Sequence, residues 1–156
     1  MLSPSSPSPS VGTMALVDLC WQGDLERVRA ALGRGEGVNS VSGGGWTGLM
    51  YAVRNKHNSL VQLLLQQPGI DVNCRDRWGQ TALHYSVTGD NPEGLRLLLA
   101  HPGMGSINTR DNDGDTPLMA AIRRGRLSCV IELVRVSGVD LDTRDDEGRS
   151  LEEVAR

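Results

Sequence analysis

The chain has 156 residues, a formal net charge of −3, 19 glycines and no phenylalanine. This length fits one domain, the acidic balance argues against a general nucleic-acid binder, and no apolar run approaches the roughly 18 residues that a membrane-spanning helix needs. We therefore expect a soluble protein with an aliphatic core and tight turns.

Residues 1–13 form a Ser/Pro-rich segment that cannot bury enough apolar area to order itself. Ser3, Ser6 and Ser8 each precede a proline and match the pattern of proline-directed kinases, which is short and of low specificity. We expect an N-terminal tail that becomes ordered only by packing against another surface, for example that of a neighbouring molecule.

A segment of eight residues then recurs in phase along the chain. The copies read Gly45-Trp46-Thr47-Gly48-Leu49-Met50-Tyr51-Ala52, Gly79-Gln80-Thr81-Ala82-Leu83-His84-Tyr85-Ser86 and Gly114-Asp115-Thr116-Pro117-Leu118-Met119-Ala120-Ala121, and a weaker copy begins at Gly148. Their hydroxyl residues Thr47, Thr81, Thr116 and Ser150 are 34, 35 and 34 positions apart. Four occurrences at this spacing indicate a repeat protein.

The residues of each unit predict a tight reversal, two helices and a connecting segment, the return, that leads to the next reversal. Segments such as Asp76-Arg77-Trp78-Gly79 form tight reversals, because Asp accepts local backbone hydrogen bonds and Gly adopts positive φ. The next Thr caps a first helix, and Pro117 takes the first helical position, where its missing donor costs nothing. A second helix carries an apolar stripe, as in Leu60-Val61-x-Leu63-Leu64-Leu65. Neighbouring units must bury these stripes together.

In its period and signature the sequence resembles the ankyrin repeat, whose unit has about 33 residues and reads Thr-Pro-Leu-His-x-Ala. Thr116-Pro117-Leu118 keeps the family proline and His84 keeps the histidine, which in the family ties neighbouring hairpins together. The resemblance implies an all-α solenoid of stacked helix-turn-helix units with short β-hairpin fingers. The domain would span residues 14–156, with units at about 14–41, 42–75, 76–110 and 111–144 and a partial unit at 145–156.

Two second helices depart from the family pattern. Gly94 occupies an apolar position and Glu132 falls where an apolar residue is usual, so we expect these helices to be looser. The chain stops at Arg156, about two turns into the first helix of a fifth unit. This abrupt stop favours the hypothesis that the chain is a fragment of a longer array.

Motifs for chemistry are few. Residues 43–48 match G-x-G-x-x-G, but they straddle a reversal and a helix cap rather than a βαβ unit. Residues 111–115 alternate carboxylates like a calcium loop, yet Thr116 and Ile122 stand where that loop needs Gly and Glu. No two histidines share metal-ligand spacing. We therefore expect no metal, no cofactor and no catalysis.

The cysteines Cys20, Cys74 and Cys129 are odd in number and widely spaced, without a Cys-x-x-Cys pair. They predict neither a disulfide framework nor a zinc site, and Cys20 and Cys129 fit small core positions. No cationic region followed by an apolar one marks a secretory signal. The cytoplasm or the nucleus is the expected location.

Partners of proteins similar to this one contact the hairpin tips and the exposed side of the first helices, which line a concave surface. Carried over residue by residue, the resemblance gives a candidate binding set that includes all three tryptophans. The set is Trp21, Trp46, Arg54, Arg75, Arg77, Trp78, Gln80, Arg110, Asn112, Asp115, Arg123 and Arg124. Trp and Arg are the residues that dominate interface hot spots.

A second interpretation of these residues stays open. Trp46 and Trp78 could instead fold across adjacent hairpin tips and bury their own area, Trp21 could cap the end of the array, and the arginines could form a solvated face paired with aspartates. If the arginines bind, they favour an acidic peptide or protein surface, because guanidinium groups pair carboxylates bidentately. The interleaved acids make nucleic acid the weaker alternative.

The resemblance also implies a modification. Leu65 stands eight residues before Asn73 in Asp71-Val72-Asn73, which resembles the sequence that asparaginyl hydroxylases accept in ankyrin repeats. Modification of Asn73 is a hypothesis.

The sequence thus predicts a non-catalytic protein-protein interaction module, acting as an adaptor, an inhibitor or a scaffold. Two alternatives remain. The chain could be the targeting domain of a larger enzyme that continues beyond Arg156, or a structural unit that self-assembles through its tail or its uncovered C-terminal end.

Overall fold

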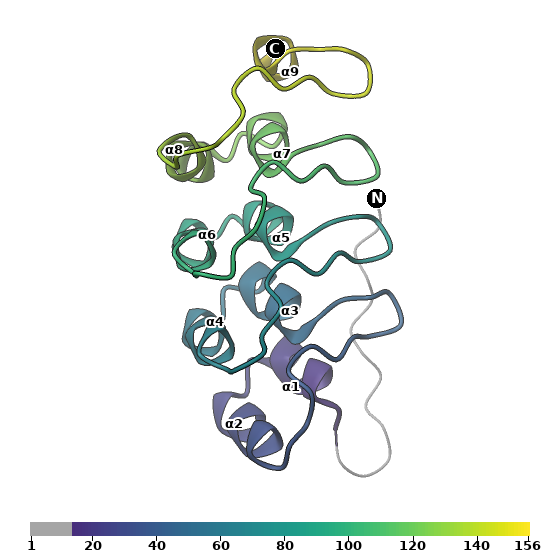
Figure 1. Cartoon of the computed structure of the whole chain (residues 1–156), viewed down its shortest axis with the longest axis vertical. Coiled ribbons are helices and arrows are strands. Elements are labelled where there is room, and N and C mark those ends of the chain that lie inside the picture. Colours follow the sequence, from purple (N-terminus) through teal and green to yellow (C-terminus); the bar gives the residue numbers. More distant parts are fainter. Residues whose placement is uncertain (1–13) are drawn as a thin grey trace.

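Helices come in antiparallel pairs, and the pairs stack along one axis (Figure 1). The structure is a computed structural model that describes residues 14–156; the Ser-Pro sites and the tail proposed for self-association lie outside this range. One column holds the inner helices α1 (Leu16–Gln22), α3 (Gly48–Arg54), α5 (Ala82–Thr88), α7 (Pro117–Arg123) and α9 (Leu151–Ala155). The other holds the outer helices α2 (Leu25–Gly33), α4 (Asn58–Leu65), α6 (Pro92–Leu99) and α8 (Leu127–Val134). This is the expected all-α solenoid.

The inner helices begin at the predicted caps. The Thr47 hydroxyl accepts a hydrogen bond from the Met50 amide at 3.2 Å, and Thr116 does the same for Met119. Pro117 is the first residue of α7. At Thr81 the contact is made by His84, whose Nδ1 accepts a hydrogen bond from the Thr81 amide at 3.2 Å. The inner helices that follow a finger therefore start at a fixed point.

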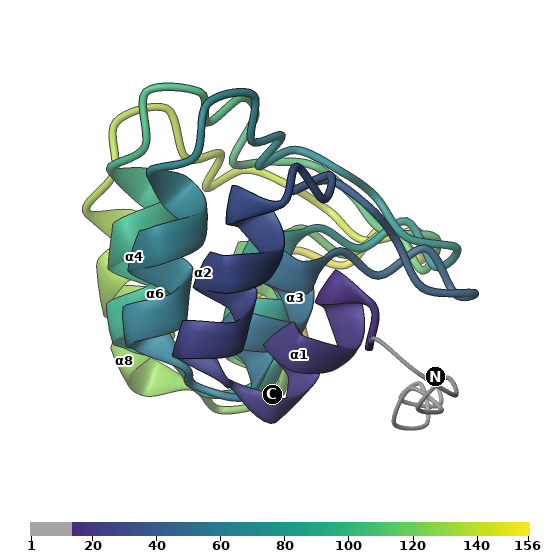
Figure 2. The same cartoon turned by 90° about the horizontal axis from the view of Figure 1, so that it is seen from below.

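The fingers are tight reversals that project from the inner helices at a steep angle (Figure 2). The Asp76 amide donates to the Gln80 carbonyl at 3.0 Å, and the Asp76 Oδ1 accepts the amides of Trp78 and Gln80, both at 2.9 Å. Asp111 and Asp145 repeat this arrangement. Between residues 14 and 156 the only strand-like pairing is an isolated bridge of Val41 with Thr47. The fingers are closed by aspartate side chains rather than by a β-ladder.

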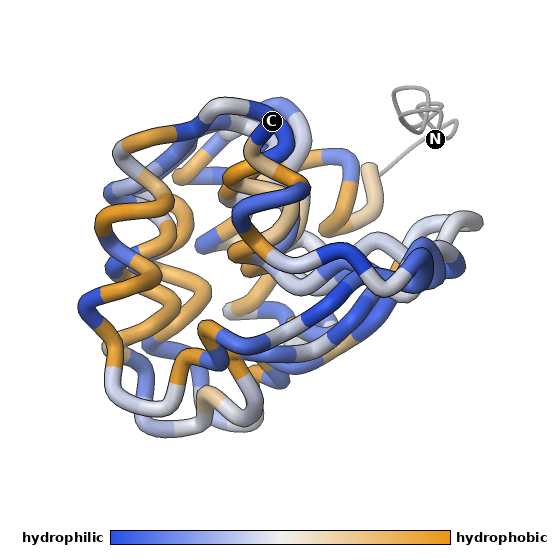
Figure 3. Tube along the Cα trace, turned by 90° about the horizontal axis from the view of Figure 1, so that it is seen from above, coloured by the Kyte–Doolittle hydropathy of each residue, from blue (hydrophilic) through white to orange (hydrophobic). Residues whose placement is uncertain are grey.

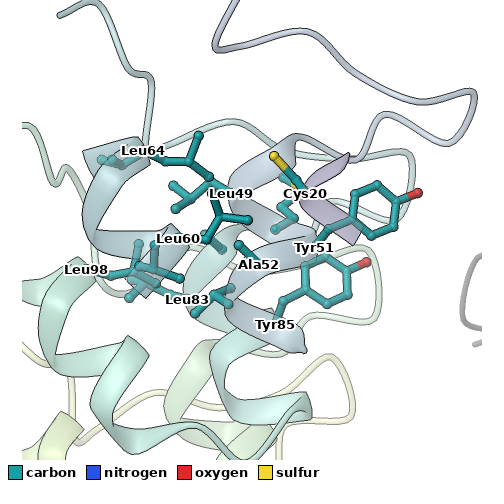
Figure 4. Close-up of a cluster of buried hydrophobic side chains, with 14 of the residues drawn as sticks. Cys20, Leu49, Tyr51, Ala52, Leu60, Leu64, Leu83, Tyr85 and Leu98 are labelled. Carbon is teal, nitrogen blue, oxygen red and sulfur yellow. The ribbon is translucent and has the colours of Figure 1, made fainter. Parts of the chain in front are cut away.

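The core fills the space between the two helix columns (Figure 3). Leu49, Leu60, Leu83 and Leu98 are buried and pack across neighbouring pairs (Figure 4). As expected, the buried side chains are mostly aliphatic, with Tyr51 and Tyr85 at the edge nearest the fingers.

The expectation of a loose helix at Gly94 is wrong. Gly94 is buried in α6, and a Cβ there would lie 2.8 Å from the Val53 Cγ2 of α3. The missing side chain leaves room for Val53 and for the Asn91 side chain at the start of α6. Glu132 in α8 forms an ion pair with Arg96 of α6 at 3.3 Å, so polar contact replaces apolar contact at that position.

The C-terminal end of the stack is less covered. Leu127 and Val134 of α8 are 71 % and 44 % exposed, and α9 contains no buried residue. No helix in residues 14–156 has both the length and the apolar character that crossing a membrane requires.

Candidate functional site

The fingers and the inner helices meet at an angle, and we call the surface inside this angle the finger face (Figure 2). The predicted binding residues come from the fingers and the inner helices, and they differ in accessibility. Exposed members are Trp21, Arg75, Arg77, Arg110, Asn112, Arg123 and Arg124; half-buried members are Arg54, Trp78 and Asp115; buried members are Trp46 and Gln80.

Trp46 is in the core, so its prediction as an accessible binding residue is wrong. It is 1 % exposed, and its ring centroid lies 3.9 Å from that of Tyr85 and 4.8 Å from that of Tyr51. The second interpretation, in which the indole buries its own area, holds here. The preceding residues 43–45 are glycines and offer no apolar side chain to fill the space between the tyrosines.

We number each finger by the repeat unit that it opens, so the third, fourth and fifth fingers are residues 76–80, 111–115 and 145–149. Trp78 lies half-buried at the third finger, where it packs on the core and still presents part of its ring. The Arg77 guanidinium carbon is 5.2 Å from the centre of this ring, a cation–π arrangement. The Arg77 amide donates to the Gly44 carbonyl of the preceding finger at 3.2 Å. The third finger thus offers an exposed cation on an aromatic support.

The finger aspartates Asp76, Asp111 and Asp145 also accept a hydrogen bond from the finger face. Asp76 accepts the Tyr85 hydroxyl, and Asp111 Oδ2 accepts the Gln80 Nε2 at 3.0 Å. Burial, followed by the hydrogen bond to Asp76, raises the pKa of Tyr85. These two bonds link side chains of the inner-helix region to the bases of the fingers.

At Asp145 the partners are arginines. Its Oδ2 lies 2.8 Å from the Arg149 Nε and 3.3 Å from the Arg123 Nη2. Burial alone would raise the pKa of Asp145, but the backbone and side-chain hydrogen bonds from Arg149 and the bond from Arg123 lower it to about 2. The carboxylate is therefore charged at any physiological pH.

Arg123 bridges two fingers. Its guanidinium contacts the Asp115 carboxylate at 2.8 and 3.2 Å in addition to Asp145. Hydrogen bonding to Asp115 raises the pKa of Arg123. An arginine held by two carboxylates is neutralised within the protein, so it offers little charge to an acidic partner.

Two other predicted arginines tie neighbouring fingers together. Arg75 donates its Nη2 to the Arg110 carbonyl at 2.7 Å, and Arg110 donates to the Thr143 hydroxyl at 3.3 Å. Arg54 is half-buried beside the core. Arg124 is exposed at the end of α7. Arg75, Arg110 and Arg123 thus all bond to groups within the protein.

Two adjoining cavities lie on the finger face near the C-terminal end. One, of about 320 Å³, is lined by Asp113, Asp115, Arg123, Asp145, Asp146, Glu147 and Arg149. The other, of about 310 Å³, is lined by Gln80, His84, Thr88, Asp111, Asp113, Asp115, Ala120, Arg123 and Arg124. The three residues Asp113, Asp115 and Arg123 belong to both, so the cavities form one groove. Its excess of carboxylates was not recognised from the sequence, where acids and arginines simply alternate.

His84 ties two units together, as the resemblance implied. Its Nε2 lies 2.9 Å from the Asp115 carbonyl of the next finger, and because a carbonyl only accepts, Nε2 carries the proton. Its Nδ1 then accepts from Thr81. Burial lowers the pKa of His84, whereas the bond to the Asp115 carbonyl acts in the opposite direction. The imidazole is neutral and structural.

The thiols are protonated at neutral pH. Burial raises the pKa of Cys20 to about 12 and those of Cys74 and Cys129 to about 11, and all three are free cysteines. Thiolates are the reactive form of cysteine, so these groups are poor nucleophiles. Among residues 14–156 no group of three His, Cys, Asp or Glu side chains is arranged to hold a metal ion.

Asn73 is exposed and lies in the return after α4. Its Nδ2 donates to the Gly103 carbonyl at 2.9 Å and its Oδ1 accepts the Gly105 amide at 2.9 Å. Asn39 and Asn108 bond the following returns in the same way. Modification of Asn73 stays a prediction, and a hydroxylase would have to free this side chain from both bonds.

Comparison with known proteins agrees with this architecture. A family model described as ankyrin repeats in three copies matches residues 14–111 and 49–145. A probable 26S proteasome regulatory subunit, p28, of Saccharomyces cerevisiae is 30% identical over 138 residues, which is 87% of this chain and 60% of that protein.

Two further relatives are much longer proteins. Mouse Rabankyrin-5 is 30% identical over 111 residues, or 71% of this chain and 9% of its own length. Human neurogenic locus notch homolog protein 2 is 34% identical over 86 residues, or 55% of this chain and 3% of its own length. The chain therefore matches less than two thirds of each of these relatives.

Proposed function

Because the chain belongs to the ankyrin repeat family, we propose that it is a non-catalytic protein-protein interaction module that binds its partner on the finger face. The observation that carries this proposal is the row of hydrogen bonds between neighbouring fingers. The Arg77 amide donates to the Gly44 carbonyl at 3.2 Å, and the Asn112 amide donates to the Trp78 carbonyl at 3.0 Å. A surface held in place before binding loses little conformational freedom on binding.

The third finger is the proposed contact for an acidic segment of the partner. Arg77 is exposed and lies over the Trp78 ring, which limits the conformations that its side chain must give up. A guanidinium group pairs a carboxylate through two parallel hydrogen bonds. Arg77 and Trp78 are therefore the residues of the predicted set that we expect to contribute most to binding.

Charge reversal at the third finger tests this proposal. The chain is tethered and used to capture proteins from a cell extract, which mass spectrometry identifies, with Arg77→Glu as the variant and Arg29→Glu as the control. Arg29 is an exposed arginine of α2, outside the finger face. We expect Arg77→Glu to lose partners that the wild type and Arg29→Glu retain, since hot-spot residues contribute about 2 kcal/mol or more.

Both variants should unfold at the wild-type temperature, which separates loss of binding from loss of structure. Capture of the same proteins by all three chains would contradict the proposal. The two alternatives from the sequence have their own tests: the gene downstream of Arg156 shows whether an enzyme domain follows, and sedimentation at increasing concentration shows whether the chain self-assembles.

A further inference from the structure

Negative charge collects at the C-terminal end of the finger face. The two adjoining cavities, which we call the acidic groove, have six carboxylates and three arginines in their walls. The carboxylates are Asp111, Asp113, Asp115, Asp145, Asp146 and Glu147. Residues 14–110 contain one more basic than acidic side chain, whereas residues 111–156 contain four more acidic than basic ones. The net charge of the chain therefore changes sign along the stack.

The arginines in the walls neutralise only part of this charge. Arg123 is held by Asp115 and Asp145, and Arg149 is held by Asp145 at 2.8 Å. Asp113 is exposed, and its carboxylate forms no hydrogen bond or ion pair within residues 14–156. Glu147 is 72% exposed and contacts only Arg149, at 3.1 Å. Carboxylates thus remain available to a cation that enters the groove.

A separate observation concerns a buried side-chain amide in the groove wall, whose oxygen receives no hydrogen bond. Gln80 is 5 % exposed and lines the groove together with Asp111, to which its Nε2 donates. A carboxylate only accepts, so the amide orientation is fixed and Oε1 is the free acceptor. Oε1 has no hydrogen-bond partner. Leaving a buried acceptor without a donor is costly, and a donor group from outside would relieve that cost.

We propose that the acidic groove accepts a lysine or arginine side chain from a basic segment of the bound partner. This inference rests on the proposed function and adds the direction in which the partner lies along the finger face. The basic part of the partner lies against the fourth and fifth fingers, and its acidic part lies against Arg77. The cation contacts Asp113 and its neighbours and brings a donor to the side of the groove where Gln80 lies.

The test is a titration of the ¹⁵N-labelled chain with a blocked peptide in which glycine and lysine alternate. A peptide with glutamate in place of lysine is the opposite-charge control. We expect the lysine peptide to shift the amide signals of Asp113, Asp115, Asp146 and Glu147 saturably, and the glutamate peptide to leave them unchanged. Binding should weaken as salt is added, because exposed charges are screened.

Matched variants locate the site. Asp113→Asn should weaken binding of the lysine peptide about two- to fivefold, the range that single exposed ion pairs contribute. Asp142→Asn removes the same charge from an exposed aspartate that does not line the groove, and should change nothing. An equal effect of both variants, shifts spread over all acidic residues, or equal binding of the glutamate peptide would each overturn the inference.

The two proposals fail in distinguishable ways. If Arg77→Glu loses its partners but the lysine peptide does not bind, only the acidic groove is refuted. If the lysine peptide binds as expected but Arg77→Glu captures the same proteins as the wild type, the proposed contact at the third finger is refuted instead.

Discussion

Protonation of His84 is opposed by the folded structure. Its Nε2 hydrogen bonds the Asp115 carbonyl, and its Nδ1 accepts from Thr81. A second proton on the ring would turn Nδ1 into a donor facing the Thr81 amide, which is itself a donor. Together with burial, this opposition keeps the imidazole neutral in the folded chain.

The stability of the protein should therefore fall as the pH drops below about 6.5. In the unfolded chain His84 has its ordinary pKa and takes up a proton there, whereas burial lowers its pKa in the folded chain. The unfolded state gains that proton first, so unfolding becomes easier until the pH reaches the lower folded pKa. Thermal unfolding at pH 7.5 and 5.5 should show this loss.

The control is His84→Gln, which has no group that titrates in this range. We expect the variant to lose less stability than the wild type between the two pH values, whatever its stability at pH 7.5. An equal loss in both chains would show that other groups cause the effect. An NMR titration of the His84 ring gives its pKa directly.

Single side chains were also the hardest feature to predict from the sequence. Trp46 and Trp78 lie near finger tips of neighbouring units, yet Trp46 is buried and Trp78 is half-buried. Trp46 packs on Tyr85, which is 39 positions away. Arg123 is likewise held by Asp145 of the next finger. Contacts between units decide these outcomes, and local patterns do not contain them.

Helices, by contrast, follow from local signals. The cap at Thr116, the proline after it and the apolar spacing of the second helices are visible within one unit, and the structure confirms them. Gly94 is the exception, because its role depends on Val53 and Asn91. A glycine inside a helix predicts weakness only where no neighbour occupies the space that a side chain would fill.

Two glycine-to-alanine substitutions should accordingly change the free energy of unfolding in opposite directions. In Gly94→Ala the new methyl group meets Val53 Cγ2 at 2.8 Å and the buried Asn91 amide, which is itself bonded to the Val53 carbonyl. We expect a loss of about 1–3 kcal/mol in the free energy of unfolding, as for other overpacked sites.

Gly33→Ala is the matched control in α2. A Cβ at Gly33 meets nothing within 4 Å, and the backbone there is helical. We expect a gain of about 0.4–1 kcal/mol from the lower entropy of the unfolded chain. Urea unfolding of both variants measures the two changes, and a stabilised Gly94→Ala would contradict the close packing of α6 on α3.

On the scale of the whole molecule, stability should decrease toward the C-terminal end. Units of a solenoid contact only their neighbours, so an end unit lacks half of its support. The end helix α9 has no buried residue, and α8 exposes Leu127 and Val134. The inner helices α3 and α5, in contrast, are mostly buried.

Hydrogen exchange followed by mass spectrometry should reveal this gradient. We expect peptides from α8 and α9 to exchange before those from α3 and α5, since local opening needs less free energy where fewer apolar groups are exposed by it. Exchange of all four helices at one common rate would show that the stack opens only as a whole.

The asparagines of the returns give the stack a direction. Asn39, Asn73 and Asn108 each bind the return on their C-terminal side through one donor and one acceptor. The corresponding position of the last return is Asp142, whose carboxylate has no donor to offer. Under mechanical tension along the axis, these three pairs of hydrogen bonds lie in series and would all carry the same load.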